Sequence, residues 1–522
     1  MKSIAHALNP RNWRMGVWAA ICLLGVIMSS YAWIVASPTG ASPDDDFHQI
    51  SIWCPTPDDG SCNPQTGADG SMSVEVPQTV AFSACYAFYN TKSAACTEHL
   101  SDDVMIRTTR FNDGLYPGGY YDAMHMFVEH DVDRAVLVMR WVNVGLAALI
   151  YGSIFLLASL SGRRLIVYTL LGTAVPLVTY FSTSLNPSAW AILGVTSAWL
   201  ALHLAISSPS RPRRIALLGI GVVGATLGAM ARADAGAYLV IVACAIIAFH
   251  WTTIIHKLRL VLPTILVAAI GGIGFLNGRQ SSSALSNGMY VNITPDSDPL
   301  RVLVYNVYHI PDFIAGFWSF DMGWLDTGVP WTTTILSAAV AIGLCCFGLS
   351  RGRISLWQAL SLIGLAVALV AVPVAILQAS LSFFPGSIQA RYIAPLIIVF
   401  VGTCLADRKE MPAPLPLAAT VCFFAFIVAA NVYALHMQIE RYVSGLGGPK
   451  AINLSLGIQW WRAGGPSPMY TWILGSLGFA LMSTILFAVR MQTRDSTTPE
   501  EVSAPHARRG MSEIDEDRVP QP

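Results

Sequence analysis

The chain has 522 residues, of which 54% are hydrophobic and only 12% are charged, and its mean hydropathy is +0.54. A soluble domain carries about twice that charged fraction, so the composition excludes an ordinary soluble enzyme. The formal net charge is zero and therefore gives no indication of a nucleic-acid partner. Apolar stretches of membrane-spanning length recur from residue 135 to residue 490, and backbone in hydrocarbon must satisfy its own hydrogen bonds. The sequence predicts an all-α polytopic membrane protein.

About twelve apolar runs have the length that a bilayer requires. They are 16–36, 135–160, 165–182, 188–206, 215–231, 236–255, 260–277, 331–349, 355–380, 391–406, 416–436 and 470–490. Lys and Arg in short loops stay cytoplasmic. Because Arg11 and Arg14 precede the first run and every second connection returns to a basic loop, we expect a multi-pass plasma-membrane protein with both termini in the cytoplasm.

The connections between these runs divide the chain into parts. We expect a cytoplasmic N-terminus (1–15), a first transmembrane helix (16–36), an extracytoplasmic loop domain (37–134), a multi-helix membrane domain (135–490) with outer loops 278–330 and 437–469, and a disordered cytoplasmic tail (491–522). The first helix could instead be a signal peptide. Its apolar run is longer than that of a typical signal peptide, and the residues that follow are a poor cleavage context, so we predict an uncleaved anchor.

Four of the ten cysteines lie in the predicted loop domain: Cys54, Cys62, Cys85 and Cys96. An even number of cysteines in an oxidising compartment predicts two disulfides, for which three pairings are possible. A zinc site is the competing interpretation, but the spacing lacks a Cys-x-x-Cys pair and no His stands at a matching position. We therefore expect a small, disulfide-stapled domain built from turns and short strands.

An acidic cluster follows the first helix in the run Pro43-Asp44-Asp45-Asp46-Phe47-His48. Taken alone, it is compatible with a solvated cap at the end of a helix. On an extended segment, however, Asp44 and Asp46 would point to the same face, as a pair that binds a proton or a metal would need. A divalent metal is possible there but not favoured, and no other cofactor is indicated.

Arginines form a second set of candidate residues. Arg140 lies inside the second predicted helix, where a charge is costly unless it is paired or faces a wet cavity. Arg232 and Asp234 stand at an outer turn, and Arg391 with Tyr392 opens the tenth run. Any one of them could simply extend to the membrane surface. Several on the outer face indicate an anionic ligand such as a lipid monophosphate or pyrophosphate, because Arg binds phosphate through two hydrogen bonds.

The outer loop 278–330 is rich in aromatic residues, and its Phe317-Trp318 end is typical of a belt at the membrane surface. A sugar-stacking platform is the functional alternative, with Asp312, Asp321 and Asp326 supplying hydrogen bonds. An amphipathic helix at the membrane surface would reconcile the two interpretations.

Five short segments resemble the recurring segments of the bacterial polytopic membrane proteins grouped as domain of unknown function 2142. They are Pro43-Asp44-Asp45-Asp46-Phe47-His48, Met139-Arg140-Trp141-Val142, Leu185-Asn186-Pro187-Ser188, Gly323-Trp324-Leu325-Asp326 and Ala390-Arg391-Tyr392-Ile393. The resemblance spans roughly residues 15–490. The layout, with a long acidic outer loop after helix one, many further spans and outer arginines, is similar to the C superfamily of membrane glycosyltransferases (GT-C), which take sugars from polyprenyl-phosphate carriers.

This resemblance implies a GT-C-like fold, a lipid-linked sugar donor and a cell-envelope glycan or glycolipid as acceptor. It implies that one carboxylate of the triplet deprotonates the acceptor hydroxyl, with Asp45 as first choice and Asp44 or Asp46 as equal alternatives. The family usually shows an Asp-Glu pair at this point, so the three Asp residues leave the register open. His48 would orient the acid or the acceptor. The residues expected to hold the donor phosphate are Arg140, Arg232, Arg391 and Tyr392.

Two other functions are compatible with the sequence. About twelve spans are common in transporters and lipid flippases, although the long outer loop after helix one has no counterpart in the second half of the chain, whereas transporters are usually built from repeated halves. A non-catalytic role in envelope assembly is the third possibility. The sequence contains no P-loop, H-E-x-x-H or nucleophile-elbow motif, so an ATPase, zinc protease or serine hydrolase is not supported.

Overall fold

The structure is a computed structural model that describes residues 10–55, 62–279, 298–319, 321–352, 354–385, 388–406, 414–446 and 452–491. In these ranges the chain is mostly helical, as predicted. The predicted cytoplasmic tail from residue 492 onward lies outside the described residues, as do residues 280–297 of the outer loop.

Nine helices in the described ranges are long and apolar enough to cross a membrane. They are α2 (Pro10–Ala36), α6 (Val132–Leu157), α9 (Ser188–Ser207), α10 (Arg211–Ala231), α13 (Val261–Asn277) with the short helix η3 (Leu258–Leu260), α17 (Trp331–Leu349), α18 (Leu356–Ala379), α20 (Leu417–Val443), and α21 (Pro468–Ser483) with α22 (Ile485–Met491). The chain is thus a multi-pass membrane protein. Which end of each helix faces the cytoplasm remains a prediction.

The expected twelve spans are not confirmed, because three of the predicted runs fall short. The run 165–182 is divided into α7 (Leu160–Gly172) and α8 (Pro176–Ser182), which meet at an angle of 99°. The break precedes Pro176, whose ring disfavours a helical conformation in the residue before it. The other two runs are shorter helices: α11 (Ala233–Phe249), and α19 (Ala394–Leu405) with the turn η4 (Ala390–Ile393). If the bent pair is counted as one span, the total is ten.

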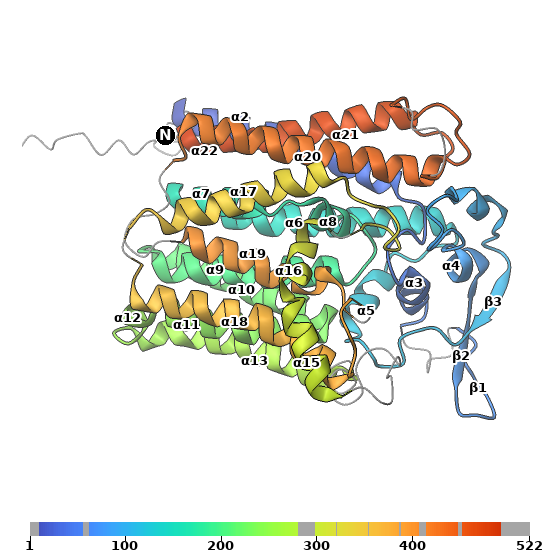
Figure 1. Cartoon of the computed structure of the whole chain (residues 1–522), viewed down its shortest axis with the longest axis horizontal. Helices are drawn as coiled ribbons and strands as arrows, with labels where there is room; N and C mark the ends of the chain where they lie inside the picture. The colour runs from blue at the N-terminus through green and yellow to red at the C-terminus, as the bar shows by residue number, and fades with distance from the viewer. Residues whose placement is uncertain are drawn as a thin grey trace, which may run out of the picture.

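The long helices lie alongside one another, with α2, α20, α21 and α22 together on one side (Figure 1). α9 is the central helix, because every residue from Ser188 to Ile206 is buried. Short helices complete the described membrane domain: α12 (Trp251–Ile254), α15 (Pro299–Tyr308) and α16 (Ile310–Ser319). α15 exposes an apolar stripe at helical spacing that includes Leu300, Val304 and Tyr308, which agrees with the expected amphipathic helix. Phe317 is buried in the core and Trp318 is half-buried, so Phe317 cannot be part of the aromatic belt that the sequence suggested for this end.

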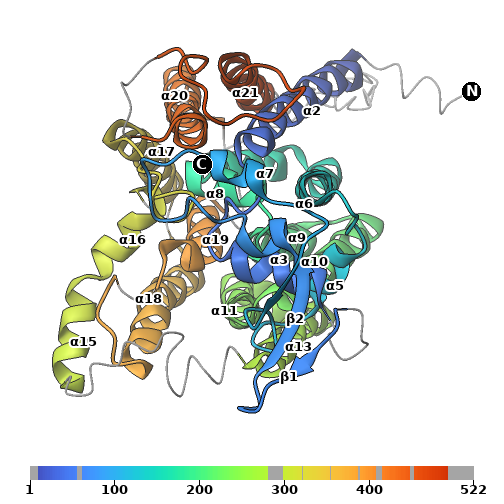
Figure 2. The same ribbon diagram turned by 90° about the vertical axis from the view of Figure 1, so that its right-hand side faces the viewer.

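The loop domain lies at one end of the helices, as Figures 1 and 2 both show. Its elements are α3 (Asp45–Trp53), β1 (Gln65–Thr66), β2 (Met72–Pro77), α4 (Gln78–Phe82), η2 (Ala94–His99), β3 (Met105–Thr108) and α5 (Gly119–His125). The strands form an antiparallel sheet in the order β1-β2-β3, in which Val74 pairs with Thr108. Disulfides join Cys54 to Cys62 and Cys85 to Cys96. The expected two disulfides are confirmed, and the pairing is sequential.

We expect the contact between α2 and α21 to tolerate no added side chain at Gly478. A Cβ atom built there lies 2.5 Å from the backbone nitrogen of Ser29 and 2.6 Å from Cβ of Met28. Gly478→Ala should therefore lower the thermal unfolding midpoint of the purified protein in detergent, since overpacking costs about 1–3 kcal/mol. Gly272→Ala in α13 is the matched control, because a Cβ atom there meets nothing within 4 Å. Equal midpoints for the two variants would contradict the close helix contact.

Candidate functional site

The segment between α2 and α3 is held by side chains from distant parts of the chain. Each carbonyl from Ser37 to Pro43 accepts a hydrogen bond. The donors are Arg140 for Ser37 (2.5 Å) and Pro38 (2.8 Å), Tyr86 for Thr39 (2.9 Å), Trp324 for Gly40 (2.7 Å), Tyr180 for Ala41 (2.6 Å), the backbone of Asp45 for Ser42 (3.1 Å) and Asn186 for Pro43 (3.0 Å). Buried carbonyls need such partners. We call residues 37–43 the anchored segment, because its course is fixed up to Asp44.

Arg140 belongs to this support. Its buried guanidinium also donates to the carbonyl of Ile34 (3.2 Å), near the end of α2. The last carbonyls of a helix lack partners within it and attract cations. The structure therefore places the guanidinium of Arg140, which the sequence suggested as a phosphate ligand, against the backbone at the end of α2.

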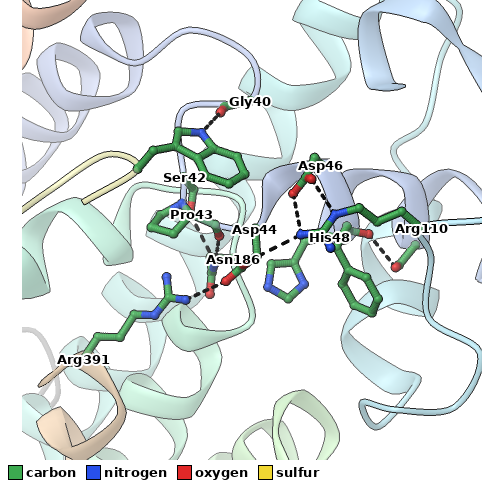
Figure 3. A network of polar contacts seen from close by, with 12 residues as sticks. Gly40, Ser42, Pro43, Asp44, Asp46, His48, Arg110, Asn186 and Arg391 are labelled. Carbon is green, nitrogen blue, oxygen red and sulfur yellow. Dashed lines mark hydrogen bonds and ion pairs between the residues drawn. The ribbon is translucent and has the colours of Figure 1, made fainter. Parts of the chain in front are cut away.

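The three acids do not lie on an extended segment as the sequence suggested, because α3 begins at Asp45. Asp44 itself has a φ of 62°, a left-handed conformation that few residues other than glycine adopt, although Asp and Asn tolerate it best. As a result the three side chains have different surroundings: Asp44 faces Arg391, Asp46 faces Arg110, and Asp45 is enclosed. Figure 3 shows Asp44 between the two arginines.

Asp44 is the carboxylate that joins the loop domain to the membrane domain. Its Oδ2 accepts a hydrogen bond from Nη2 of Arg391 at 2.9 Å, and its Oδ1 lies 3.8 Å from Nη2 of Arg110. Burial alone would raise the pKa of Asp44, but the positive charges of Arg391 and Arg110 hold it below the ordinary value. Asp44 is therefore ionised at neutral pH while a quarter of its side chain remains exposed.

Asp46 and Asp45 both accept hydrogen bonds from neighbouring groups of the protein. Asp46 pairs with Arg110 through both carboxylate oxygens. Asp45 has no exposed surface, and its Oδ2 accepts hydrogen bonds from the backbone of Ser42 (2.9 Å) and from Gln49 (3.2 Å). Burial raises the pKa of Asp45 to about 8, although the charge of Arg140 opposes the rise. Asp45, which the sequence suggested first as the base, is thus enclosed and protonated at neutral pH.

His48 lies on the first turns of α3, in an aromatic surrounding. Its Nδ1 hydrogen-bonds to the hydroxyl of Tyr121 at 2.9 Å, and its ring packs edge-on against Tyr116. Nε2 is buried and has no hydrogen-bonding partner in the described part of the chain. Burial lowers the pKa of His48 to about 3, so the imidazole is neutral. In the described part of the chain its ring makes no hydrogen bond to the three acids.

Arg391 and Arg232 come together over one aromatic ring. The guanidinium carbons lie 5.2 Å and 4.5 Å from the ring centre of Tyr392. Arg232 forms two hydrogen bonds of 2.9 Å with Asp234, as their spacing in the sequence allows. Among the described residues, no acceptor completes a hydrogen bond with the buried Nη1 of Arg232 or with the buried Nε and Nη1 of Arg391. These donors are suited to a planar or tetrahedral anion.

Helix ends add to the positive potential here. α11 begins directly after Arg232, and Arg391 and Tyr392 lie in η4, at the N-terminal end of α19. The N-terminus of a helix carries a partial positive charge and free N–H groups. The structure thus brings Arg232, Arg391 and Tyr392 together with Asp44, while Arg140 and Asp45 remain in the supporting layer.

A second buried ion pair connects α20 to the loop before α17. Arg441, near the end of α20, donates to Asp326 at 2.6 Å and to the carbonyl of Tyr86 at 3.0 Å. Asp326 is therefore occupied, whereas Asp312 is largely exposed and pairs with His309. In the described ranges no group of three His, Cys, Asp or Glu side chains is arranged to hold a metal ion.

Sequence reasoning did not assign a role to Arg110, Asn186 or Arg441. Asn186 stood inside one of the family-like segments and could have been selected for that reason. Arg110 carries no signal, because it lies in a polar loop far from the acids in sequence and meets them only through the fold. Arg441 follows an apolar run, and a basic residue at a helix end is common, so its position in the sequence did not indicate a role.

Residues 27–400 match the family described as predicted membrane protein (DUF2142). The chain belongs to this family. The DUF2142 match includes the acidic triplet, Arg140, Arg232 and Arg391, and it ends before Arg441. No curated protein and no solved structure matches the chain.

The raised pKa of Asp45 predicts a pH dependence of stability. Between pH 3.8 and about 8 the folded chain keeps a proton on Asp45 that the unfolded chain has lost, so its contribution falls by up to about 1.4 kcal/mol for each pH unit gained. His48 opposes this fall only below its ordinary pKa of 6.5, since its folded pKa is about 3. Asp45→Asn should therefore gain stability relative to the unchanged protein between pH 6.5 and 8.

Thermal unfolding midpoints in detergent at pH 6, 7 and 8.5 would measure this difference. The control is Asp69→Asn, a change at an exposed carboxylate whose partner is the hydroxyl of Ser71, which does not titrate in this range, so all three midpoints should shift alike. Parallel pH curves for Asp45→Asn and the unchanged protein would show that Asp45 is ionised in the folded state.

Proposed function

We propose that this chain is a membrane glycosyltransferase that moves a sugar from a polyprenyl-phosphate donor to a cell-envelope acceptor at the outer face. The observation that carries the proposal is the pairing of ionised Asp44 with Arg391, whose remaining guanidinium nitrogens are buried without a partner in the described ranges. A base and an anion-binding group stand side by side, as transfer from a phosphate leaving group requires.

The donor phosphate would bind to Nε and Nη1 of Arg391 and to Nη1 of Arg232. A buried donor without an acceptor costs free energy, so a phosphate that supplies acceptors to these nitrogens would relieve that cost. Tyr392 keeps the two guanidiniums in place through its ring face. The fork of Arg matches the oxygens of a phosphate, which a Lys at the same position would not.

Asp44 would act as the general base. Its carboxylate takes the proton of the acceptor hydroxyl while the hydroxyl oxygen forms a bond to the anomeric carbon of the sugar. The bond between that carbon and the phosphate oxygen breaks, and its electron pair leaves on polyprenyl phosphate, where the arginines stabilise the added charge. The products are the glycosylated acceptor, polyprenyl phosphate and one proton on Asp44.

Asp44 is a better candidate than Asp45 or Asp46 for two reasons. It is ionised and partly exposed, whereas Asp45 is enclosed and its raised pKa keeps it protonated. It also contacts Arg391 directly, whereas Asp46 is held by Arg110 through both oxygens. The left-handed backbone at Asp44, fixed by the anchored segment, is the kind of strain that accompanies functional positions.

Asp44→Asn should lower sugar transfer by a factor of about 100 or more, because general-base catalysis typically contributes that much. Asn also tolerates the left-handed backbone, so the fold should persist. The measurement is release of polyprenyl phosphate by the protein in lipid vesicles, supplied with polyprenyl-phosphate hexoses and pentoses and an envelope extract as acceptor. The matched control is Asp103→Asn, an exposed acid of the same loop domain, which should keep full activity.

Arg391→Lys should raise the donor KM and lower kcat, because Lys keeps the charge but loses the two-point contact. Arg107→Lys is its control, since Arg107 pairs with Glu75 across the sheet. Full transfer by Asp44→Asn would overturn the proposal. Passage of the intact donor to the other leaflet without release of polyprenyl phosphate would instead assign a flippase.

A further inference from the structure

A short exposed segment of the loop domain carries chemistry that the proposed transfer step does not use. Residues 88–92 read Phe-Tyr-Asn-Thr-Lys, and all five are exposed. Phe88 has 69% and Tyr89 59% of its surface in contact with solvent, and Nζ of Lys92 lies 4.2 Å from the ring centre of Tyr89. We call this segment the aromatic tip. Two aromatic faces thus stand beside an amide, a hydroxyl and an ammonium group.

The backbone of the tip is strained. Phe88 has a φ of 65°, a region that bulky side chains avoid because Cβ clashes with the backbone. Such strain costs about 1–3 kcal/mol and persists only where the surrounding structure imposes it. A glycine would relieve it, yet the position holds a large exposed aromatic ring. Stability of the fold alone therefore does not account for the exposed ring at this position.

The tip is also held rigidly from below. The Cys85–Cys96 disulfide closes the loop. Arg441 donates to the carbonyl of Tyr86, which precedes the tip, and to the carbonyl of Lys92, the last residue of the tip. The backbone nitrogen of Leu446 donates to the carbonyl of Asn90 at 2.7 Å. A surface fixed in this way loses little conformational entropy when a ligand binds.

The surroundings indicate that the tip faces water rather than lipid. α20 has 27 residues, which is about 40 Å of helix, whereas the hydrocarbon core is about 30 Å thick. Leu446, which contacts Asn90, lies beyond the end of α20. The exposed polar residues Asn90, Thr91 and Lys92, which follow the two rings, agree with an aqueous position.

The tip is connected to the anchored segment. The ring of Phe88 packs edge-on against Trp324 at 5.4 Å, and the indole nitrogen of Trp324 donates to the carbonyl of Gly40 at 2.7 Å. Tyr86, in the same loop, donates to Thr39. The contacts that fix the approach to Asp44 therefore also fix the tip.

We propose that the aromatic tip binds the acceptor as a glycan. One face of a sugar ring carries C–H groups and packs on an aromatic face, while its hydroxyls hydrogen-bond at the edge. Phe88 and Tyr89 supply the faces, and Asn90, Thr91 and Lys92 supply the polar edge. The assignment of this glycan as the acceptor rests on the proposed function. Binding of a glycan by the tip can be measured without it.

The test is binding of a panel of soluble glucose, mannose, galactose and rhamnose oligosaccharides to the full chain in lipid nanodiscs, followed by saturation-transfer NMR. Glycoside detergents are avoided, since their headgroups would compete. At least one oligosaccharide should bind, and the double variant Phe88→Gly/Tyr89→Ala should lose at least ten-fold in affinity. Because glycine suits the backbone at position 88, that variant should unfold no more readily than the unchanged protein.

Phe82→Ala is the matched control, since Phe82 is an exposed aromatic residue of the same domain, half of whose surface faces solvent, and it should bind as before. Binding that persists in the double variant, or no binding of any oligosaccharide, overturns the inference. A spin label at Tyr89→Cys that is reached by oxygen in the lipid but not by a water-soluble nickel complex would assign the tip to the membrane and also overturn it.

Asp44→Asn separates this inference from the proposed function. It should leave oligosaccharide binding unchanged while transfer is lost. If the tip variant loses binding but no chain transfers sugar, the glycan site stands and the transferase proposal fails. If Asp44→Asn loses transfer but the tip variant binds normally, only the inference about the tip fails.

Discussion

The structure depends on satisfying the backbone carbonyls of residues 37–43, which leave a membrane helix and remain buried. A buried carbonyl without a donor costs about 1–3 kcal/mol, and a segment this long would be untenable without partners. The partners come from Arg140 on α6, Tyr180 on α8, Asn186 before α9, Trp324 in the outer loop and Tyr86 in the loop domain. A polar requirement of the backbone thus draws the membrane helices and the loop domain to one point, and Asp44 is the residue presented there.

The buried arginines differ in which of their guanidinium nitrogens have an acceptor. Arg140 and Arg441 use most of their donors on carbonyls and, for Arg441, on Asp326, so their charges are stabilised within the protein. Arg232 and Arg391 are equally buried. Among the described residues Arg140 and Arg441 each leave only Nε without an acceptor, whereas Arg232 leaves the terminal Nη1 and Arg391 leaves both Nε and Nη1. A buried charge is tolerated when it is paired and hydrogen-bonded. The terminal nitrogens of Arg232 and Arg391 that lack an acceptor, unlike those of Arg140, are therefore the physical reason to expect an anion at this point.

The sequence predicted the features that depend on local pattern. Apolar runs located every long helix, and four cysteines in one outer loop located both disulfides. It could not predict which carboxylate is available, because a helix that begins at Asp45 turns three adjacent side chains in three directions. It could not find Arg110, whose contact with Asp46 joins residues far apart in the chain. Nor could hydropathy show that three apolar runs stop short of a full span, since a helix that ends against buried polar groups has the same composition as one that ends in water.

The lengths of the two short helices, α11 and α19 with η4, indicate how deep in the membrane Arg232 and Arg391 lie. α11 has 17 residues, which corresponds to about 25 Å of helix, and η4 with α19 is of similar length; the hydrocarbon core is about 30 Å thick. Both begin beside an arginine, Arg232 and Arg391. If their other ends reach the opposite edge of that core, as the predicted topology requires, these arginines lie slightly inside the hydrocarbon boundary, just below the lipid headgroups. A soluble anion would have to enter such a position from water, whereas a lipid phosphate already lies next to it, at the edge of the core. The shortness of these helices thus favours a lipid-borne ligand over a soluble one.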